Sequence, residues 1–255
     1  IDWTPDEINI VLNIALQVKK EKKAGEIHQR FLGKSIALLF EKRSTRTRCS
    51  FETAFGEEGG HPVFLSTQDI QLGGKESIED TARVLGRMYD GIEYRGFSQE
   101  LVQQLADYAG VPVWNGLTDE FHPTQMLADI MTMYENFGEV KGRKLVFLGD
   151  ARNNVANSLM VICSKLGIDF CCCAPSELFP KKELVKKCRE FAAAHGSKII
   201  LTEDPEENKY ISESENEVVF YDKKNYFLYI IIFFSFPFPS KGSTIFKTCI
   251  ISFIT

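Results

Sequence analysis

The sequence predicts an α/β fold made of two doubly wound lobes, each with a parallel sheet. Short apolar runs alternate with segments of helical periodicity from residue 4 to about residue 205. Several of these runs are apolar at consecutive positions, which is typical of strands buried on both faces. Glycines at positions 138 and 142 separate a long helical pattern from a new strand and mark the break between the lobes. Ligands of such folds bind at the carboxyl ends of strands, so we expect the functional residues in the loops that follow strands.

The elements follow in order along the chain. Thr4 is suited to cap a first helix, with Pro5 in its first turn and Glu7 three residues on. Strands are expected at residues 35–40, 91–94, 111–114, 144–148, 170–173 and 198–201, and further helices at residues 48–58, 77–88, 99–109, 122–137, 155–166 and 181–195. We therefore predict lobes at residues 1–138 and 139–205. Residues 206–255 form an atypical tail, first acidic and then rich in Phe and Ile, without clear periodicity.

Composition excludes several classes of protein. The 255 residues include 35 acidic and 30 basic side chains, for a net charge of −5, which argues against broad binding to nucleic acid or anionic membranes. The apolar run at 226–238 is shorter than the roughly 20 residues needed to span a bilayer. The first residues lack the basic start and apolar run of a signal peptide. We expect no nucleic-acid or membrane partner.

Cysteine usage favours a reducing compartment. The seven cysteines form no spaced pairs, which fits free thiols in a cytoplasmic protein and makes a metal site an unfavoured interpretation. The triplet at residues 171–173 is expected to be buried strand rather than a ligand or redox motif.

The strongest functional signal is the segment at residues 44–48, directly after a buried strand and at a helix start. Its sequence, Ser-Thr-Arg-Thr-Arg, brings hydroxyls, arginines and unpaired helix N–H groups to one place, which predicts an anion site. The alternative is a solvated basic turn. It is not a Walker P-loop, because GxxxxGK[ST] is absent.

Two further post-strand loops of the first lobe carry candidate residues. His122 and Gln125 lie three residues apart at a helix start and can share one face, although such a histidine is more often a cap or a packed residue. Arg95 follows a strand. In the second lobe, Asn153 and Asn154 precede a helix, where they could bind a ligand or merely cap the helix.

These residues together resemble the ornithine carbamoyltransferases. The SxRT phosphate motif of that family is similar to residues 44–47, and its HPxQ motif to residues 122–125. The stretches at 75–91, 94–97 and 113–121 also resemble ornithine rather than aspartate enzymes. The resemblance covers about residues 1–204.

The resemblance implies carbamoyl transfer from carbamoyl phosphate to the δ-amine of L-ornithine, which yields citrulline and phosphate in arginine metabolism. It implies no metal or organic cofactor, a homotrimer, and a loop from a neighbouring subunit that completes the site. Gln71 lies in the matching stretch, with Lys75 as a second candidate. By the same resemblance, Arg95 and His122 are catalytic, and the carbamoyl phosphate site consists of Ser44, Thr45, Arg46, Thr47, Gln71, Arg95, His122 and Gln125. Asn154 would bind ornithine.

The sequence also departs from the family. The downstream DxxxSMG and HCLP motifs are absent, so we expect the second lobe to be incomplete and turnover to be weak or absent. A frameshift, an unspliced intron or an assembly error would explain the tail. Two alternatives stay open: a putrescine carbamoyltransferase, and a non-catalytic remnant that binds carbamoyl phosphate.

Overall fold

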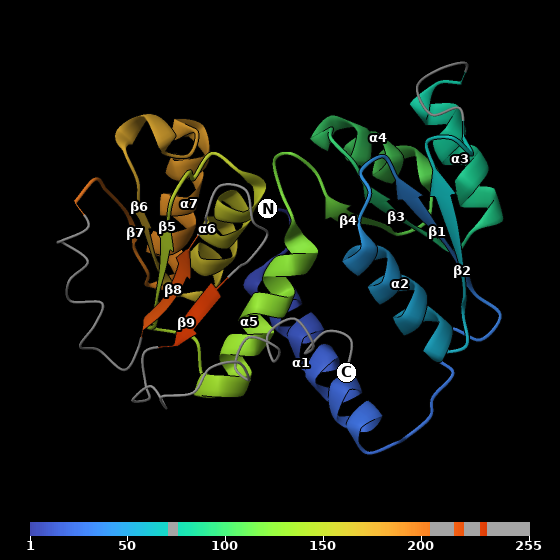
Figure 1. The fold of residues 1–255 in the computed structure, drawn as a ribbon, viewed down its shortest axis with the longest axis horizontal. Coiled ribbons are helices and arrows are strands. Elements are labelled where there is room, and N and C mark those ends of the chain that lie inside the picture. The colour runs from blue at the N-terminus through green and yellow to red at the C-terminus, as the bar shows by residue number, and fades with distance from the viewer. Residues whose placement is uncertain (71–75, 205–216, 222–229, 234–255) are drawn as a thin grey trace. The chain divides into compact units, whose positions relative to one another are not determined.

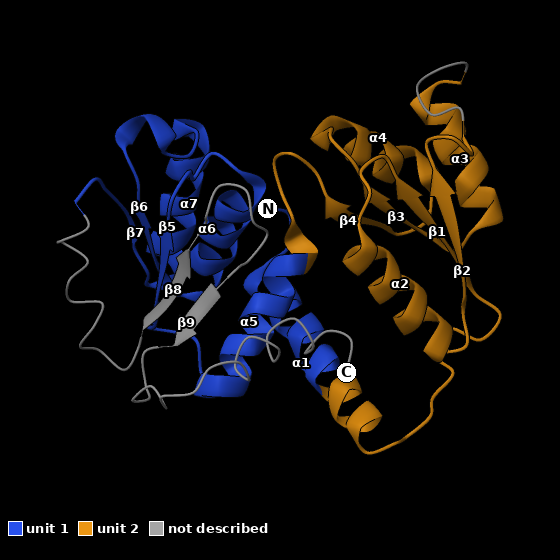
Figure 2. Ribbon diagram, in the orientation of Figure 1, with its two compact units in different colours: residues 1–16, 125–252 blue, residues 17–124, 253–255 orange. Residues whose placement is uncertain are grey.

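The structure, a computed structural model, describes residues 1–70, 76–204, 217–221 and 230–233. It divides into two compact units (Figures 1 and 2). The described part of one unit comprises residues 17–70 and 76–124. The described part of the other comprises residues 1–16, residues 125–204 and the two strands beyond them. Each unit contains one sheet, as the α/β prediction requires.

The sheet of residues 17–124 has four parallel strands in the order β2-β1-β3-β4. Its elements are the second part of α1 (Pro5–Lys23), β1 (Ser35–Phe40), α2 (Thr45–Glu57), β2 (His61–Ser66), α3 (Ile78–Met88), β3 (Gly91–Arg95), α4 (Gln99–Ala109) and β4 (Val113–Leu117). The crossover helices place the carboxyl ends of all four strands at one edge. The loops that contain residues 44–47, Arg95 and His122 follow strands of this sheet.

Strand β1 lies in the core, and its side chains are buried on both faces of the sheet. Ile36, Leu38 and Phe40 pack with phenylalanines of α2 and β2, while Ala37 and Leu39 pack with residues of α3 and α4. This burial confirms the prediction of a strand at residues 35–40. The helices thus cover both faces of the first sheet (Figure 1).

Three local expectations need correction. Strand β2 is absent from the sequence-based expectations, because Pro62 interrupts its short apolar run. The strand tolerates this proline because it lies at the edge of the sheet. Helix α2 begins at Thr45, three residues earlier than expected, because Ser44 caps it. Strand β4 extends to Leu117 instead of ending at residue 114.

The second sheet has the order β7-β6-β5-β8-β9, in which only β9 runs antiparallel. Its unit contains the first part of α1, α5 (Pro123–Phe137, of which residues 125–137 belong here), β5 (Lys144–Leu148), α6 (Asn154–Leu166), β6 (Asp169–Cys173), a 3₁₀ turn (Ser176–Leu178), α7 (Lys182–His195), β7 (Ile199–Thr202), β8 (Glu217–Tyr221) and β9 (Ile230–Phe233). The cysteine triplet lies buried in β6, as predicted for core strand.

Residues 1–16 and 125–137 belong to the compact unit of the second sheet, although the sequence pattern suggested a division at residue 138. Polar contacts link this part of the unit: Lys165 Nζ donates to Ile1 O at 2.6 Å, and Tyr134 OH donates to Asn9 Oδ1 at 3.5 Å. The predicted capping box is confirmed, since Thr4 N donates to Glu7 Oε2 at 2.7 Å and Glu7 N to Thr4 Oγ1 at 3.3 Å.

Strands β8 and β9 lie in the stretch that the sequence left without regular structure. Strand β8 pairs in parallel with β5, with Lys144 opposite Glu217. Two parallel strands need a long crossover connection, so no short-range sequence pattern predicts that β8 pairs with β5. The remainder of the predicted tail lies outside the described residues. Among the helices that the structure describes, none is both long and apolar enough to cross a bilayer.

Candidate functional site

The start of helix α2 is organised by Ser44. Its backbone is extended, and its Oγ accepts a hydrogen bond from Thr47 N at 3.2 Å while its hydroxyl donates to Thr47 Oγ1 at 3.1 Å. Thr45 and Arg46 are exposed on the first turn. The helix therefore presents N–H groups, hydroxyls and a guanidinium at the carboxyl end of β1, which suits an anion.

Arg95 ends strand β3 and lies beside this turn. Its Nη1 donates to Thr47 Oγ1 at 3.2 Å. Its carbonyl accepts from Glu41 N at 2.8 Å and from Lys42 N at 3.3 Å, which ties the loop after β1 to β3. The structure thus brings Arg95 together with residues 44–47, which lie some fifty positions earlier in the chain.

His122 precedes α5, and its charge state follows from its surroundings. Desolvation by burial, followed by the positive charges of Arg95 and Arg46, lowers the pKa of His122 to about 3. Both arginines lie close enough to His122 for their positive charges to act on its pKa. Its Nδ1 lies 3.3 Å from Thr124 Oγ1, whose hydroxyl can donate to it. The imidazole is therefore neutral throughout the physiological range.

The lowered pKa predicts an acid-sensitive fold. The unfolded chain protonates this histidine near its ordinary pKa of 6.5, whereas the folded chain does so only near 3. The stability contribution is therefore complete above pH 6.5 and is lost as the pH falls toward 3, at up to about 1.4 kcal/mol per pH unit. We expect His122→Asn to flatten the fall in unfolding free energy, measured by urea denaturation between pH 7 and pH 5.

The matched control for this prediction is His61→Asn, at an exposed histidine at the start of β2. It should keep the pH dependence of the wild type. Equal slopes for wild type and His122→Asn would contradict the assigned charge state.

Gln125 lies in the first turn of α5, as predicted. The side-chain amide of Gln125 is hydrogen-bonded to Asp129, a residue that the sequence analysis did not identify. Gln125 Nε2 donates to Asp129 Oδ1 at 3.0 Å. Burial raises the pKa of Asp129 to about 7, and the hydrogen bond from Gln125 opposes that rise. An aspartate on the otherwise apolar stripe of a helix, four residues after Gln125, was the available signal.

In the unit that contains the second sheet, Asn153 and Asn154 have different positions. Asn153 caps α6, because its Oδ1 accepts from Val155 N at 2.9 Å and from Ala156 N at 3.0 Å. Asn154 is the first residue of the helix and is partly exposed. The capping interpretation therefore holds for Asn153, while Asn154 keeps a position after β5 where a ligand could contact it. Gln71 and Lys75 lie outside the described residues.

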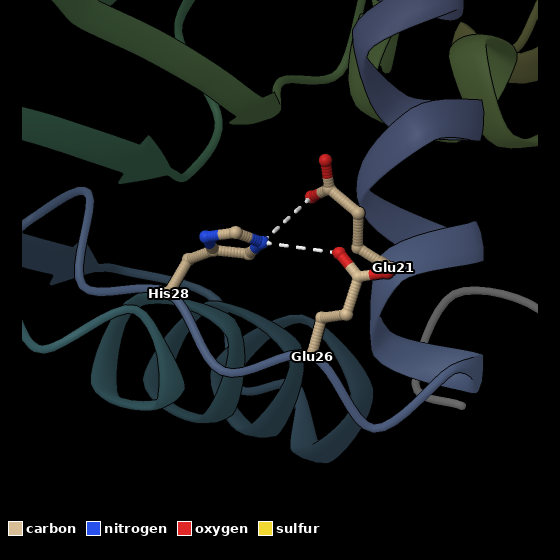
Figure 3. Close-up of side chains that lie close together, drawn as sticks. All are labelled: Glu21, Glu26 and His28. Atoms are coloured by element: carbon tan, nitrogen blue, oxygen red, sulfur yellow. Dashed lines mark ion pairs between the residues drawn. The ribbon is translucent and has the colours of Figure 1, made fainter.

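One cluster has the composition of a metal site. Glu21, Glu26 and His28 hold potential ligand atoms within 4.8 Å of one another (Figure 3). His28 Nε2 lies 3.7 Å from Glu21 Oε2 and 3.5 Å from Glu26 Oε2. Glu21 also accepts from Gln17 and is ion-paired with Arg30. Glu26 and His28 are exposed and Glu21 is partly buried, and the contacts of the cluster are those of a surface ion-pair network.

Two sequence models match the chain. The carbamoyl-P binding domain of aspartate/ornithine carbamoyltransferase matches residues 1–135, and the Asp/Orn binding domain matches residues 141–222. The second match runs past residue 205, where the motifs suggested that the resemblance ends. It includes strand β8, which pairs with β5.

Named relatives are similar over most of the chain. The ornithine carbamoyltransferase of Caldanaerobacter subterraneus subsp. tengcongensis is 65% identical over 206 residues, which are 81% of this chain and 66% of that protein. The catabolic ornithine carbamoyltransferase of Treponema denticola is 58% identical over 207 residues, 81% of this chain and 61% of that protein. The chain thus spans slightly less than two thirds of the length of these relatives.

A solved structure of similar fold is the ornithine carbamoyltransferase from Pyrococcus furiosus. It superposes with a TM-score of 0.83 at 42% identity, over 88% of this chain and 70% of that chain. The matching sequence models, the named relatives and this solved structure agree on the family. The chain belongs to the aspartate/ornithine carbamoyltransferase family.

Proposed function

We propose that the chain transfers the carbamoyl group of carbamoyl phosphate to the δ-amine of L-ornithine, with formation of citrulline and phosphate. The observation that carries this proposal is the contact of Arg95 with the capped, arginine-bearing start of α2. The similar proteins named ornithine carbamoyltransferase support ornithine as the acceptor. No observation favours putrescine.

The phosphate end of the substrate would bind at the start of α2. The side chains of Ser44, Thr45 and Thr47, together with the first N–H groups of the helix, supply hydrogen-bond donors. Arg46 supplies a guanidinium that neutralises charge as phosphate leaves. These interactions strengthen as the bond from the carbamoyl carbon to the phosphate oxygen breaks, so they favour the transition state.

By the family resemblance, Arg95, His122 and Gln125 would each contact the carbamoyl group. Attack by the neutral amine nitrogen on the carbamoyl carbon forms a C–N bond and a tetrahedral intermediate with a negative oxygen. Loss of one amine proton, to the departing phosphate or to solvent, and cleavage of the bond to phosphate complete the transfer. Arg95 stabilises that oxygen by charge. His122 is neutral and contributes as an N–H donor from Nε2 when the Thr124 hydroxyl donates to Nδ1. Asp129 directs the Gln125 amide, because it takes up one Nε2 hydrogen.

The acceptor and the assembly complete the proposal. Asn154 would contact the amino-acid end of ornithine. We further propose a homotrimer in which Gln71 and Lys75 of a neighbouring subunit contribute to the site, as the family resemblance implies. A cytoplasmic location is favoured by the six free cysteines among the described residues.

Calorimetry and a product assay test this function together. Carbamoyl phosphate is titrated into the full chain, and citrulline is then measured after addition of L-ornithine, with putrescine as the competing acceptor. We expect saturable binding of carbamoyl phosphate and weak turnover at most, with any product formed from ornithine rather than putrescine. Binding without either product would instead identify a non-catalytic carbamoyl-phosphate-binding protein. Absence of binding would overturn the proposal.

A further inference from the structure

Glu93 is a buried carboxyl group that the proposed reaction does not use. It lies in the middle of β3 with no exposed surface, and neither of its carboxyl oxygens has a hydrogen-bond partner. Buried polar atoms are nearly always hydrogen-bonded, so two such oxygens on one side chain require an explanation. Burial of an acidic group in this position carries a cost that an aliphatic residue would avoid.

The backbone places Glu93 on the face of β3 that carries Arg95. Side chains alternate along a strand, so residues 93 and 95 share a face, while Ile92 and Tyr94 pack on the opposite face against α3 and α4. The neighbour of Glu93 on β1 is Leu38, which packs with phenylalanines of α2. Glu93 therefore lies on the α2 side of the sheet, the same side as the anion-binding turn.

Gly116 makes room for the carboxyl group. The register between β3 and β4 shifts after Tyr94, which leaves Gly116 as an additional residue on β4. A Cβ atom at this position would lie 1.6 Å from Glu93 Oε1 and 2.7 Å from its carboxyl carbon. The carboxyl group thus occupies the volume of a missing side chain at a bulge, next to the end of β3 where Arg95 lies.

The charge on Glu93 is governed by burial and by Arg95. Burial raises the pKa of Glu93 to about 8, and the positive charge of Arg95 opposes this rise. Further charged groups among the described residues on this side of the sheet include Arg46 and the Arg48–Glu52 pair on α2 and the Lys42–Asp119 pair, while His122 is neutral. Glu41 accepts a hydrogen bond from Tyr94, whose side chain points to the opposite face. Arg95 is the group that acts on Glu93 directly.

We propose that Glu93 is a positioning residue that acts through Arg95 and sets how strongly this arginine attracts the bound anion. When Glu93 is neutral, the positive charge of Arg95 is available to the anion. When Glu93 is ionised, its carboxylate competes with the anion for that charge. Anion binding and ionisation of Glu93 therefore oppose each other, and by linkage each disfavours the other to the same extent. This inference rests on the proposed function, because it assumes that the anion is the phosphate group of the substrate.

The experiment measures binding of inorganic phosphate to the full chain by calorimetry at pH 7, 8, 9 and 9.5. Above pH 8 this probe is almost wholly dianionic, so its own charge changes little. We expect the affinity of the wild type to fall about 5- to 10-fold between pH 8 and pH 9.5, a coupling of ordinary size. Glu93→Gln should bind as tightly as the wild type at pH 7 and lose most of this fall. Glu100→Gln, at an exposed position on α4, should behave as the wild type.

A second measurement uses the wild type alone and does not depend on the folding of a variant. At pH 8.5, binding enthalpies in buffers of different ionisation enthalpy should show proton uptake when phosphate binds. Three results would overturn the role of Glu93 while leaving the anion site in place. These are a folded Glu93→Gln whose affinity still falls with pH, loss of phosphate binding by that variant at pH 7, and absence of proton uptake by the wild type. Absence of phosphate binding by the wild type at every pH would overturn the proposed anion site, and this role with it.

Discussion

Replacement of Arg95 by alanine is expected to weaken binding of inorganic phosphate by about 10- to 100-fold, because a charge-assisted hydrogen bond contributes about 1.5–3 kcal/mol. Arg95 donates to Thr47 Oγ1 at the start of α2, and His122 near it is neutral, so the histidine cannot replace the positive charge that Arg95 supplies. In any citrulline assay that shows turnover, the same variant should lose about 10²- to 10³-fold in rate. Calorimetry with phosphate measures the first effect independently of turnover.

Two variants serve as controls for this prediction. Arg95→Lys retains the charge but loses the planar fork, so its binding should lie between the wild type and alanine. Arg83→Ala removes an exposed arginine of α3 that pairs with Glu79 and Asp80. It should leave phosphate affinity within about twofold, since exposed charges at a distance are largely screened. Equal losses for Arg83→Ala and Arg95→Ala would show that only net charge matters.

Gly86→Ala is expected to destabilise the fold by at least about 1–3 kcal/mol. Gly86 lies in α3 where this helix meets the end of α4. A Cβ atom there would lie 1.8 Å from the carbonyl oxygen of Ala109 and 2.7 Å from its carbonyl carbon. These are backbone atoms, so a rotamer change cannot relieve the overlap and the helices must move apart. Urea denaturation of the wild type and the variant measures the effect.

Gly56→Ala is the matched control, since it makes the same chemical change inside helix α2. No atom lies within 4 Å of a Cβ built at Gly56. Alanine loses less conformational freedom than glycine on helix formation, so this variant should be more stable by about 0.5–1 kcal/mol. Opposite signs for the two variants are the expected result; a stabilising Gly86→Ala would contradict the close approach of α3 and α4.

Several elements of the fold could be predicted because their signals are local. The apolar run of β1, the cap at Ser44 and the capping box at Thr4 depend on residues within a few positions of one another. Strands β2 and β8 could not be predicted in this way. A proline interrupts the pattern of β2, and β8 forms a strand through pairing with β5, more than seventy residues earlier in the chain.

The candidate site shows the same division. The sequence indicated the residue types at 44–47, 95, 122 and 125 by their positions after strands and at helix starts. It did not indicate Asp129 as the partner of Gln125, nor Glu93 beneath Arg95, since an acidic residue in an apolar pattern has no defined partner until the fold is known. The assignment of Gln71 and Asn154 to substrates stays a prediction.

The sequence alone determined the α/β class and the resemblance to the carbamoyltransferases, and it predicted an anion site at residues 44–47, since short-range periodicity, capping and motif spacing depend on consecutive residues. Only the tertiary structure decided the contact of Arg95 with Thr47, the neutral state of His122 and the burial of Glu93 at the bulge of Gly116. Desolvation and electrostatic coupling depend on which distant segments enclose a group. For this reason the charges at the site, unlike its residue types, are properties of the folded chain.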